Sequence, residues 1–294
     1  MKSISSIGRN PKVQALCIGK FDGMHQGHQA IFSTLSNQIR SKEEGSVLVV
    51  CKNRTNPSLT PFQEECFPLP MIYLELSEIS SMSGEEFLLF LKDKYPNLFV
   101  VVVGEDFRFG KNRSCGIEEL QKHFKTIIVP EVKLDGEGIH TQAILSYLAE
   151  GNLIKVNAML GRIYCIRGEI CKGQGLGREK LYPTLNLLAP LYILPQSGVY
   201  ITCSKLKGKF YKSVTFLGHR LSTDGKFCIE SYLLEFDDEI RSGEMEIFFF
   251  EKMRDNQHFN SLEELKIQIA KDIALAKEYH SAQETITLVT SKLL

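Results

Sequence analysis

Short apolar runs and segments of helical periodicity alternate through the first half of the chain. Residues 13–18 form an apolar run that predicts a buried strand, and apolar residues at 30, 31, 35 and 39 then recur at helical spacing. Further strands are predicted at 46–50, 71–76, 98–103 and 126–129, and further helices at 61–66, 84–94 and 117–124. Strands that alternate with helices favour a doubly wound, mostly parallel, Rossmann-like α/β sheet.

The pattern of apolar and polar residues changes after about residue 160. Short alternating segments follow at 163–171, 198–204, 210–216, 227–236 and 244–250, with turns such as 206–209 and 224–226 between them. This spacing is typical of an antiparallel β-barrel or sandwich, and the resemblance given below favours the barrel. Ser261 predicts the start of a terminal helix, which would place Ile267, Ile269, Ile273 and Ala276 on one apolar face. We therefore expect an α/β domain over 1–155 and an all-β domain with a terminal helix over 156–294.

The amino-acid composition and charge limit the kinds of partner that the protein is expected to bind. The 294 residues are 43% hydrophobic and 24% charged, which is ordinary for a globular chain, and 35 basic residues balance 35 acidic ones. A neutral balance gives no broad cationic face, so we expect neither nucleic acid nor a membrane as partner. The eight cysteines form no CxxC pair, and there is no signal peptide or run long enough to span a bilayer. We expect a cytoplasmic protein with reduced thiols; the sequence leaves its oligomeric state open.

The loop after the first predicted strand reads Gly19-Lys-Phe-Asp-Gly-Met-His-Gln-Gly-His28. Its glycines let backbone amides approach a ligand, and the following helix start adds unpaired N–H groups, so an anion is expected there. His25 and His28 lie three residues apart and would face the same side if the helix begins near Met24. One capping histidine and one core histidine is the alternative interpretation.

A second glycine-rich segment, Gly168 to Arg178, contains alternating glycines at Gly173, Gly175 and Gly177. Such a loop could bring its amides to a nucleotide, although a plain hairpin turn is the alternative. Thr184 and Asn186 follow Pro183 and would share one face of an extended segment. Their hydroxyl and amide oxygens could then bind one hard cation.

The first half resembles the HxGH-type nucleotidyltransferases, in the form found in prokaryotic FAD synthetases. The resemblance rests on residues 19–28 and on a second block, Val103-Gly-Glu-Asp-Phe-Arg-Phe-Gly-Lys-Asn-Arg113. It implies that His25 and His28 position two polyanions for catalysis. It also implies ligand contacts for Gly19, Phe21, Asp22, Gly23, Gly104, Asp106, Phe107 and Phe109, with the Phe-x-Phe pair alternatively ordinary core material.

The second half resembles the riboflavin kinase module, in its glycine-rich loop, its Pro-Thr-x-Asn run and a later strand glutamate, Glu230. The resemblance makes Glu230 the catalytic base and Thr184 and Asn186 the ligands of Mg²⁺. Without it, Glu230 would be read as a solvated outward residue. The resemblance further implies substrate contacts for Lys172, Gly173, Gly175, Gly177 and Arg254.

Together the two resemblances imply a bifunctional enzyme that uses ATP to convert riboflavin to FMN and FMN to FAD. The family's Phe-x-Pro-His-Pro run is replaced by Cys51 to Pro57, and its Ser-Ser/Thr-Arg block by Ile139 to Ile144. Lys52, Arg54 or His140 would have to replace the missing contacts. A kinase with an impaired first domain, and a non-catalytic flavin-binding regulator, remain as alternatives.

Overall fold

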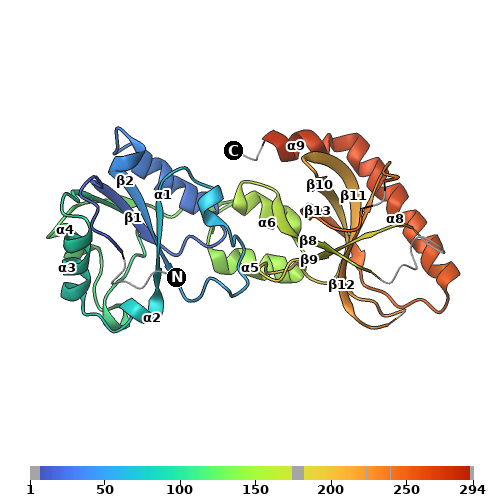
Figure 1. Ribbon diagram of the computed structural model, residues 1–294, viewed down its shortest axis with the longest axis horizontal. Helices are drawn as coiled ribbons and strands as arrows, with labels where there is room; N and C mark the ends of the chain where they lie inside the picture. Colours follow the sequence, from blue (N-terminus) through green and yellow to red (C-terminus); the bar gives the residue numbers. More distant parts are fainter. Residues whose placement is uncertain (1–6, 174–181, 223, 239, 292–294) are drawn as a thin grey trace. The chain divides into compact units, whose positions relative to one another are not determined.

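The computed structural model describes residues 7–173, 182–222, 224–238 and 240–291 (Figure 1). The chain forms two compact units, one ending at Thr141 and the other beginning at Gln142. The second unit thus includes α6 (Leu153–Leu160), which contacts two strands of that unit. Compactness alone does not define a functional domain, so the boundary between 155 and 156 stays a prediction.

The first unit is built on a five-stranded parallel sheet of order β3-β2-β1-β4-β5. Alternate residues of β1 enter two different cores: Leu16 and Ile18 pack with α3, whereas Ala15 and Cys17 pack with α1. A separate core on each face confirms the doubly wound α/β sheet. The strands are β1 (Ala15–Gly19), β2 (Gly45–Cys51), β3 (Met71–Glu75), β4 (Val100–Gly104) and β5 (Lys125–Val129).

The helices of this unit largely follow the predicted ranges. The range 84–94 is exact, because Ser83 and Glu86 form a capping box at its start. The helix predicted at 61–66 is wrong: only a single 3₁₀ turn forms, Gln63–Glu65, in a segment bounded by Pro61 and Pro68. The remaining elements are α1 (Gln26–Ser36), α2 (Leu76–Ile79), α3 (Gly84–Lys94), α4 (Ile117–Gln121), β6 (Lys133–Leu134), β7 (Glu137–Gly138) and 3₁₀ turns at Lys42–Glu44 and Lys111–Arg113.

The second unit is a closed antiparallel barrel of order β10-β11-β12-β9-β8-β13. The predicted barrel is confirmed, with β9 as a short strand that the sequence suggested only conditionally. The elements are α5 (Thr141–Glu150), β8 (Tyr164–Cys171), β9 (Leu185–Leu188), β10 (Gly198–Leu206), β11 (Lys209–His219), β12 (Phe227–Leu233), β13 (Glu244–Asp255), α8 (Leu262–Gln283) and α9 (Thr285–Ser291).

The terminal helix α8 packs on the outside of the barrel. Ser261 caps it, since its Oγ accepts a hydrogen bond from Glu264 N at 3.1 Å. Ile273 and Ala276 are buried against β10 residues, as predicted, but Ile267 is 51% exposed. Ile267 precedes Ile269 by two residues, or about 200° around the helix, so the two cannot share a face.

The barrel encloses a ring of five hydroxyl groups. Thr202, Ser204, Ser213, Thr215 and Ser231 are all fully buried. Oxygen–oxygen distances of 2.8 to 3.0 Å join them in the closed order 202, 213, 204, 231, 215 and back to 202. A ring allows every hydroxyl to donate once and accept once, which satisfies these buried polar groups without water.

His280 of α8 is buried against the barrel. Its Nδ1 lies 2.6 Å from Thr285 Oγ1, and its Nε2 lies 3.5 Å from the carbonyl oxygen of Ser213. Burial, aided by the charge of Lys212, lowers the pKa of His280 below its ordinary value. The imidazole is therefore neutral in the folded protein near neutral pH.

Because His280 is buried and neutral, we expect the second unit to lose stability as the pH falls. The unfolded chain takes up a proton at His280 as the pH falls through about 6.5, whereas the folded protein resists it, so the free energy of unfolding falls toward acid. We expect a steeper loss between about pH 7.5 and 5.5 for the wild type than for His280→Gln, measured by urea denaturation. His258→Gln, which changes an exposed histidine, should keep the wild-type slope; equal slopes in all three proteins would contradict the prediction.

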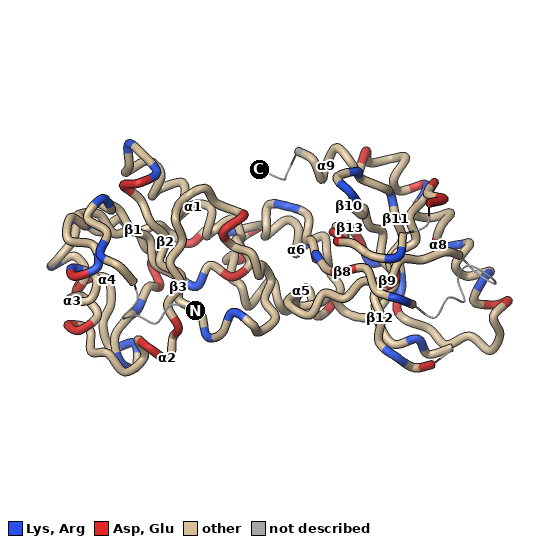
Figure 2. Tube along the Cα trace, viewed as in Figure 1, with Lys and Arg blue, Asp and Glu red and all other residues tan. Residues whose placement is uncertain are grey.

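Among the described residues, no helix combines the length and the apolar character needed to cross a membrane. Acidic and basic residues are interspersed along the elements of both units (Figure 2).

Candidate functional site

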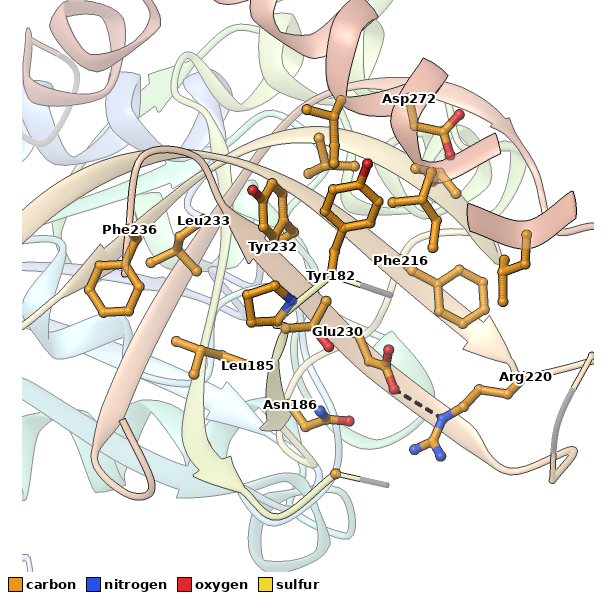
Figure 3. A pocket seen from close by; sticks show the side chains of 18 of the residues that line it. Tyr182, Leu185, Asn186, Phe216, Arg220, Glu230, Tyr232, Leu233, Phe236 and Asp272 are labelled. Carbon is orange, nitrogen blue, oxygen red and sulfur yellow. Dashed lines mark ion pairs between the residues drawn. The ribbon is translucent and has the colours of Figure 1, made fainter. Parts of the chain in front are cut away.

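A cavity of about 990 Å³ lies on the second unit, lined by residues of β9, β11, β12 and α8 (Figure 3). The lining includes most of the residues that the sequence assigned to the kinase chemistry. These are Lys172, Gly173, Thr184, Asn186, Glu230 and Arg254. Gly175 and Gly177 lie outside the described residues, so their assignment stays a prediction.

Glu230 is part of the cavity lining. On β12 it is directly opposite Asn186 of β9 and Phe216 of β11, so the three side chains share the outer face of the barrel. Its carboxylate oxygen Oε1 lies 3.1 Å from Nε of Arg220, an ion pair that is mostly buried. The solvated-residue alternative therefore does not describe Glu230, which is half-buried in a cavity and paired with an arginine.

Thr184 and Asn186 supply the oxygen atoms suited to a hard cation. Both line the cavity, and Asn186 is buried at the position opposite Glu230. No group of three or more His, Cys, Asp or Glu residues that could hold a metal occurs within the described part of the chain. A hydroxyl and an amide oxygen fit Mg²⁺, because this ion keeps several waters and takes oxygen ligands from phosphates.

Gly173 approaches Asn186 closely. A Cβ built at residue 173 would lie 2.3 Å from the side-chain nitrogen of Asn186 and 2.8 Å from its Cγ. A larger residue would thus push the Asn186 amide away from its place in the cavity wall.

We therefore expect Gly173→Ala to lower the turnover of the cavity's reaction by about tenfold or more, because the Asn186 oxygen is displaced. The measurement is the rate of ATP-dependent riboflavin phosphorylation, the reaction that the sequence resemblance leads us to expect. Gly8→Ala is the matched control, since a Cβ there meets nothing within 4 Å. Equal rates in the two variants would contradict the expected contact.

Aromatic and aliphatic side chains form the rest of the wall. Tyr182 and Tyr232 meet edge to face with ring centroids 5.4 Å apart, and Phe216 and Ile269 also line the cavity. Such a surface suits a flat aromatic ligand. The sequence motifs do not include these residues, although Tyr232 follows Glu230 by two positions and so shares its face of the strand.

Arg254 forms an ion pair with Asp272 of α8. Its Nε lies 3.0 Å from Oδ1 of Asp272 and its Nη2 lies 2.7 Å from Oδ2, and Gln268 donates to the same carboxylate at 2.9 Å. Asp272 is buried, so this pair joins the barrel to the helix within the cavity lining. A contact between Arg254 and a flavin stays a prediction.

In the first unit, the two histidines of residues 19–28 stack on each other. Their ring centroids lie 3.6 Å apart with an interplanar angle of 22°. The helix begins at Gln26, and His25 is its N-cap, with Nδ1 accepting a hydrogen bond from His28 N at 3.4 Å. The expected same-side arrangement is present, although it arises from capping geometry and not from a helix that starts at Met24.

The other predicted residues of this loop shape its backbone. Phe21 adopts a φ of 51° and Met24 a φ of 45°, conformations that cost energy in non-glycine residues and often occur at functional sites. Oδ1 of Asp22 accepts hydrogen bonds from Leu59 N at 2.9 Å and Thr60 N at 3.2 Å. Gly19 and Gly23 lie at the strand exit and in the turn that follows. Asp22 therefore organises the loop, and a ligand contact from it stays a prediction.

The aromatic residues of the two motifs pack inside the unit. Phe21 is 1% exposed and contacts Phe32, with centroids 4.8 Å apart. Phe109 is buried against Phe87, and Phe107 is half-buried beside it. Asp106 is exposed next to Gly104. Flavin contacts from these residues remain predictions.

Of the three candidates for the missing contacts, Lys52 is exposed, and Arg54 and His140 differ in their surroundings. Arg54 Nη2 lies 3.0 Å from Oε1 of Glu64, and its guanidinium covers the ring of Tyr73, so it is committed to a local cluster. His140 is 56% exposed, with Nε2 2.6 Å from Glu131. The neighbouring Thr141 donates to the carbonyl oxygen of Asp22 at 3.0 Å, which holds this segment against the histidine loop.

Comparisons with known proteins agree with both halves. A riboflavin kinase family model matches residues 160–280, and an FAD synthetase model matches residues 8–72. The bifunctional riboflavin kinase/FMN adenylyltransferase of Buchnera aphidicola (subspecies Acyrthosiphon pisum) is 29% identical, over 95% of this chain and 97% of its own length. The protein of the same name from Escherichia coli K12 is 28% identical, over 90% and 92%.

A crystal structure from Streptococcus pneumoniae, described as a macrolide-efflux protein, shares the fold. Its TM-score is 0.82 at 23% identity, over 94% of this chain and 97% of that one. The two family models match in the same order as the two units, and the curated relatives extend over nearly the whole length. The chain belongs to the bifunctional riboflavin kinase/FMN adenylyltransferase family.

Proposed function

We propose that this protein makes flavin cofactors by two reactions, the phosphorylation of riboflavin by ATP in the second unit and the adenylylation of FMN by ATP in the first. The observation that carries the proposal is the cavity beside α8. It brings Glu230, Asn186 and Thr184 together with an aromatic wall. A carboxylate, a pair of neutral oxygen ligands and a surface for a flat ring are what a kinase acting on riboflavin requires.

In the kinase reaction, the 5′-hydroxyl oxygen of riboflavin attacks the γ-phosphorus of ATP. A new P–O bond forms, the bond to the β–γ bridging oxygen breaks, and ADP leaves. Glu230 accepts the hydroxyl proton, and the Tyr182 and Tyr232 rings orient the isoalloxazine. Thr184 and Asn186 would hold Mg²⁺, whose charge offsets that of the phosphate oxygens.

In the adenylyltransferase reaction, a phosphate oxygen of FMN attacks the α-phosphorus of ATP, and pyrophosphate leaves. The nucleophile is already an anion, so no general base is needed. The stacked His25 and His28 rings and the start of α1 donate hydrogen bonds and positive potential that offset the repulsion between the two polyanions.

The test is to incubate the full-length protein with riboflavin, ATP and Mg²⁺, and to separate the flavins by chromatography. FMN should form first and FAD second, and FMN supplied with ATP should give FAD directly. Absence of FMN would contradict the kinase assignment, and tight riboflavin binding without any product would favour a regulator.

A kinase with a silent first unit is the second candidate. It is favoured by the contacts of Arg54 with Glu64 and Tyr73, which leave Lys52 and His140 as the candidates to contact the triphosphate. FMN formation without FAD formation is the result that this candidate requires.

A further inference from the structure

The carboxylate of Glu230 forms an ion pair with Arg220, which lies outside strand β12. The Arg220 side chain enters the cavity lining from the loop between β11 and β12, and its Nε lies 3.1 Å from Oε1 of Glu230. Figure 3 shows this carboxylate oxygen on the Arg220 side and the other oxygen pointing away from it. One oxygen is thus held while the other is presented elsewhere in the cavity.

Arg220 is itself fixed at several points. Its backbone closes a turn, because its N–H donates to Lys226 O at 3.0 Å and its carbonyl accepts from Gly225 N at 3.1 Å. Its Nη1 lies 3.2 Å from Oδ2 of Asp224. Its single Nε–H donates to Sγ of Cys228 at 3.1 Å, so its contact with Oε1 of Glu230 is an ion pair and not a second hydrogen bond. Burial raises the pKa of Cys228 to about 12, so this partner is a neutral thiol. The guanidinium is therefore placed before any substrate arrives.

A glutamate on a strand has three rotatable side-chain bonds, and holding it in one rotamer costs entropy. The Arg220 side chain is only 15% exposed and that of Glu230 is 22% exposed, so the pair is less screened than a surface ion pair. The planar guanidinium contacts Glu230 through Nε and Asp224 through Nη1 at the same time. A lysine has a single nitrogen and cannot make both contacts in this geometry.

We propose that Arg220 is a positioning residue for the kinase reaction: it holds Oε1 of Glu230 so that Oε2 faces the riboflavin hydroxyl. The inference rests on the proposed kinase function. In the step itself the hydroxyl proton passes to Oε2, the hydroxyl oxygen bonds to the γ-phosphorus, and ADP leaves with the electrons of the broken P–O bond. Arg220 neither takes part in these bond changes nor touches the reacting atoms.

A different role for Arg220 would be direct binding of ATP phosphates, and steady-state kinetics separate the two. If Arg220 positions Glu230, Arg220→Gln lowers kcat for FMN formation about 10- to 100-fold, while KM for ATP and riboflavin stays within about twofold. Arg220→Lys recovers part of kcat. Added guanidinium ion partly restores the turnover of Arg220→Ala. If Arg220 binds phosphate, KM for ATP rises instead.

A double-mutant cycle gives a second readout. Once Glu230 is replaced by Gln, there is no base to position, so adding Arg220→Gln should cause no further loss of kcat. Arg167→Gln is the matched control, because Arg167 pairs with Glu244 at 3.6 Å on barrel strands outside the cavity lining. This control should retain wild-type kinetics.

Riboflavin binding, followed by quenching of flavin fluorescence, reports whether each variant is folded. If Arg220→Gln does not bind riboflavin, its kcat cannot be interpreted, and the other two measurements test the inference. If Arg220→Lys recovers no kcat and guanidinium ion restores no turnover to Arg220→Ala, the inference is overturned. A kcat within twofold of wild type, a rise in KM for ATP alone, or additive losses in the cycle would also overturn it. Wild-type protein that makes no FMN, or a Glu230→Gln variant that makes it normally, would instead overturn the kinase function itself.

Discussion

Replacement of Glu230 by Gln is expected to lower kcat for FMN formation by about 10²- to 10⁴-fold, the usual contribution of a positioned general base. The amide has nearly the same shape as the carboxylate but cannot accept the hydroxyl proton. Riboflavin binding should persist, because the aromatic wall is unchanged. Conversion of supplied FMN to FAD should also persist, because that site lies in the other unit. Flavin chromatography of timed reactions measures all three results.

Glu246→Gln is the matched control for this change. Glu246 is also a strand glutamate of the barrel and pairs with Lys205 at 3.4 Å, but it does not line the cavity beside α8. Its substitution should leave FMN formation at the wild-type rate. Equal rates for the Glu230 and Glu246 variants would remove the assignment of Glu230 as the base.

Replacement of His28 by Ala is expected to lower FAD formation from FMN and ATP by about 10²- to 10³-fold, the effect of removing one preorganised hydrogen-bond donor from a site of developing charge. The substitution also removes the ring that stacks on His25 at 3.6 Å, so both predicted donors are disturbed. FMN formation should be unaffected. Release of pyrophosphate measures FAD formation, and release of ADP measures FMN formation.

His123→Ala serves as the control for the histidine prediction, because His123 is exposed on the same unit and lies beside Lys92. A His28→Ala variant that makes FAD as fast as this control would show that the histidine loop does not act in adenylyl transfer. Loss of FMN formation in the His28 variant would point instead to a general effect on folding.

The elements of the fold that depend on local patterns could be predicted from the sequence. The helix over 84–94 has a capping box at its start, and the parallel strands are continuous apolar runs. The six residues of 61–66 are too few for helical periodicity to predict a helix, and only one 3₁₀ turn forms there. The prediction for Ile267 is wrong, because a residue two positions from Ile269 lies on the opposite side of the helix and is exposed.

The site was harder to predict where partners come from different elements. Glu230 is paired with Arg220 across the β11–β12 turn, and Arg254 with Asp272 of a helix, so neither pair forms a local motif. The turn at 224–226 was predicted, but counting residues outward from it does not reveal the pair, because Glu230 lies opposite Phe216 in the register that forms. Arg220 reaches Glu230 only through its long side chain. The Arg254 pair depended on how α8 packs, which no spacing rule provides.

For His25 and His28, the alternative interpretation of one capping and one core histidine is partly right. His25 is a capping histidine, as the simpler interpretation held, because its Nδ1 accepts from His28 N. The same cap brings the two rings into a stack, so capping and a shared ligand-facing side are compatible. A sequence pattern could not have revealed this, since the φ of 45° at Met24 sets the approach to the helix.

The hydroxyl ring inside the barrel has a consequence for the cavity outside it. Ser231 belongs to the ring, and side chains of neighbouring strand residues point to opposite faces, so Glu230 must point outward. A slip of β12 by one residue would bring Glu230 into the barrel and leave the ring broken, at a cost of several kcal/mol for the buried charge. The ring therefore fixes the register of β12: five buried hydroxyls inside the barrel determine which side of the strand presents the carboxylate.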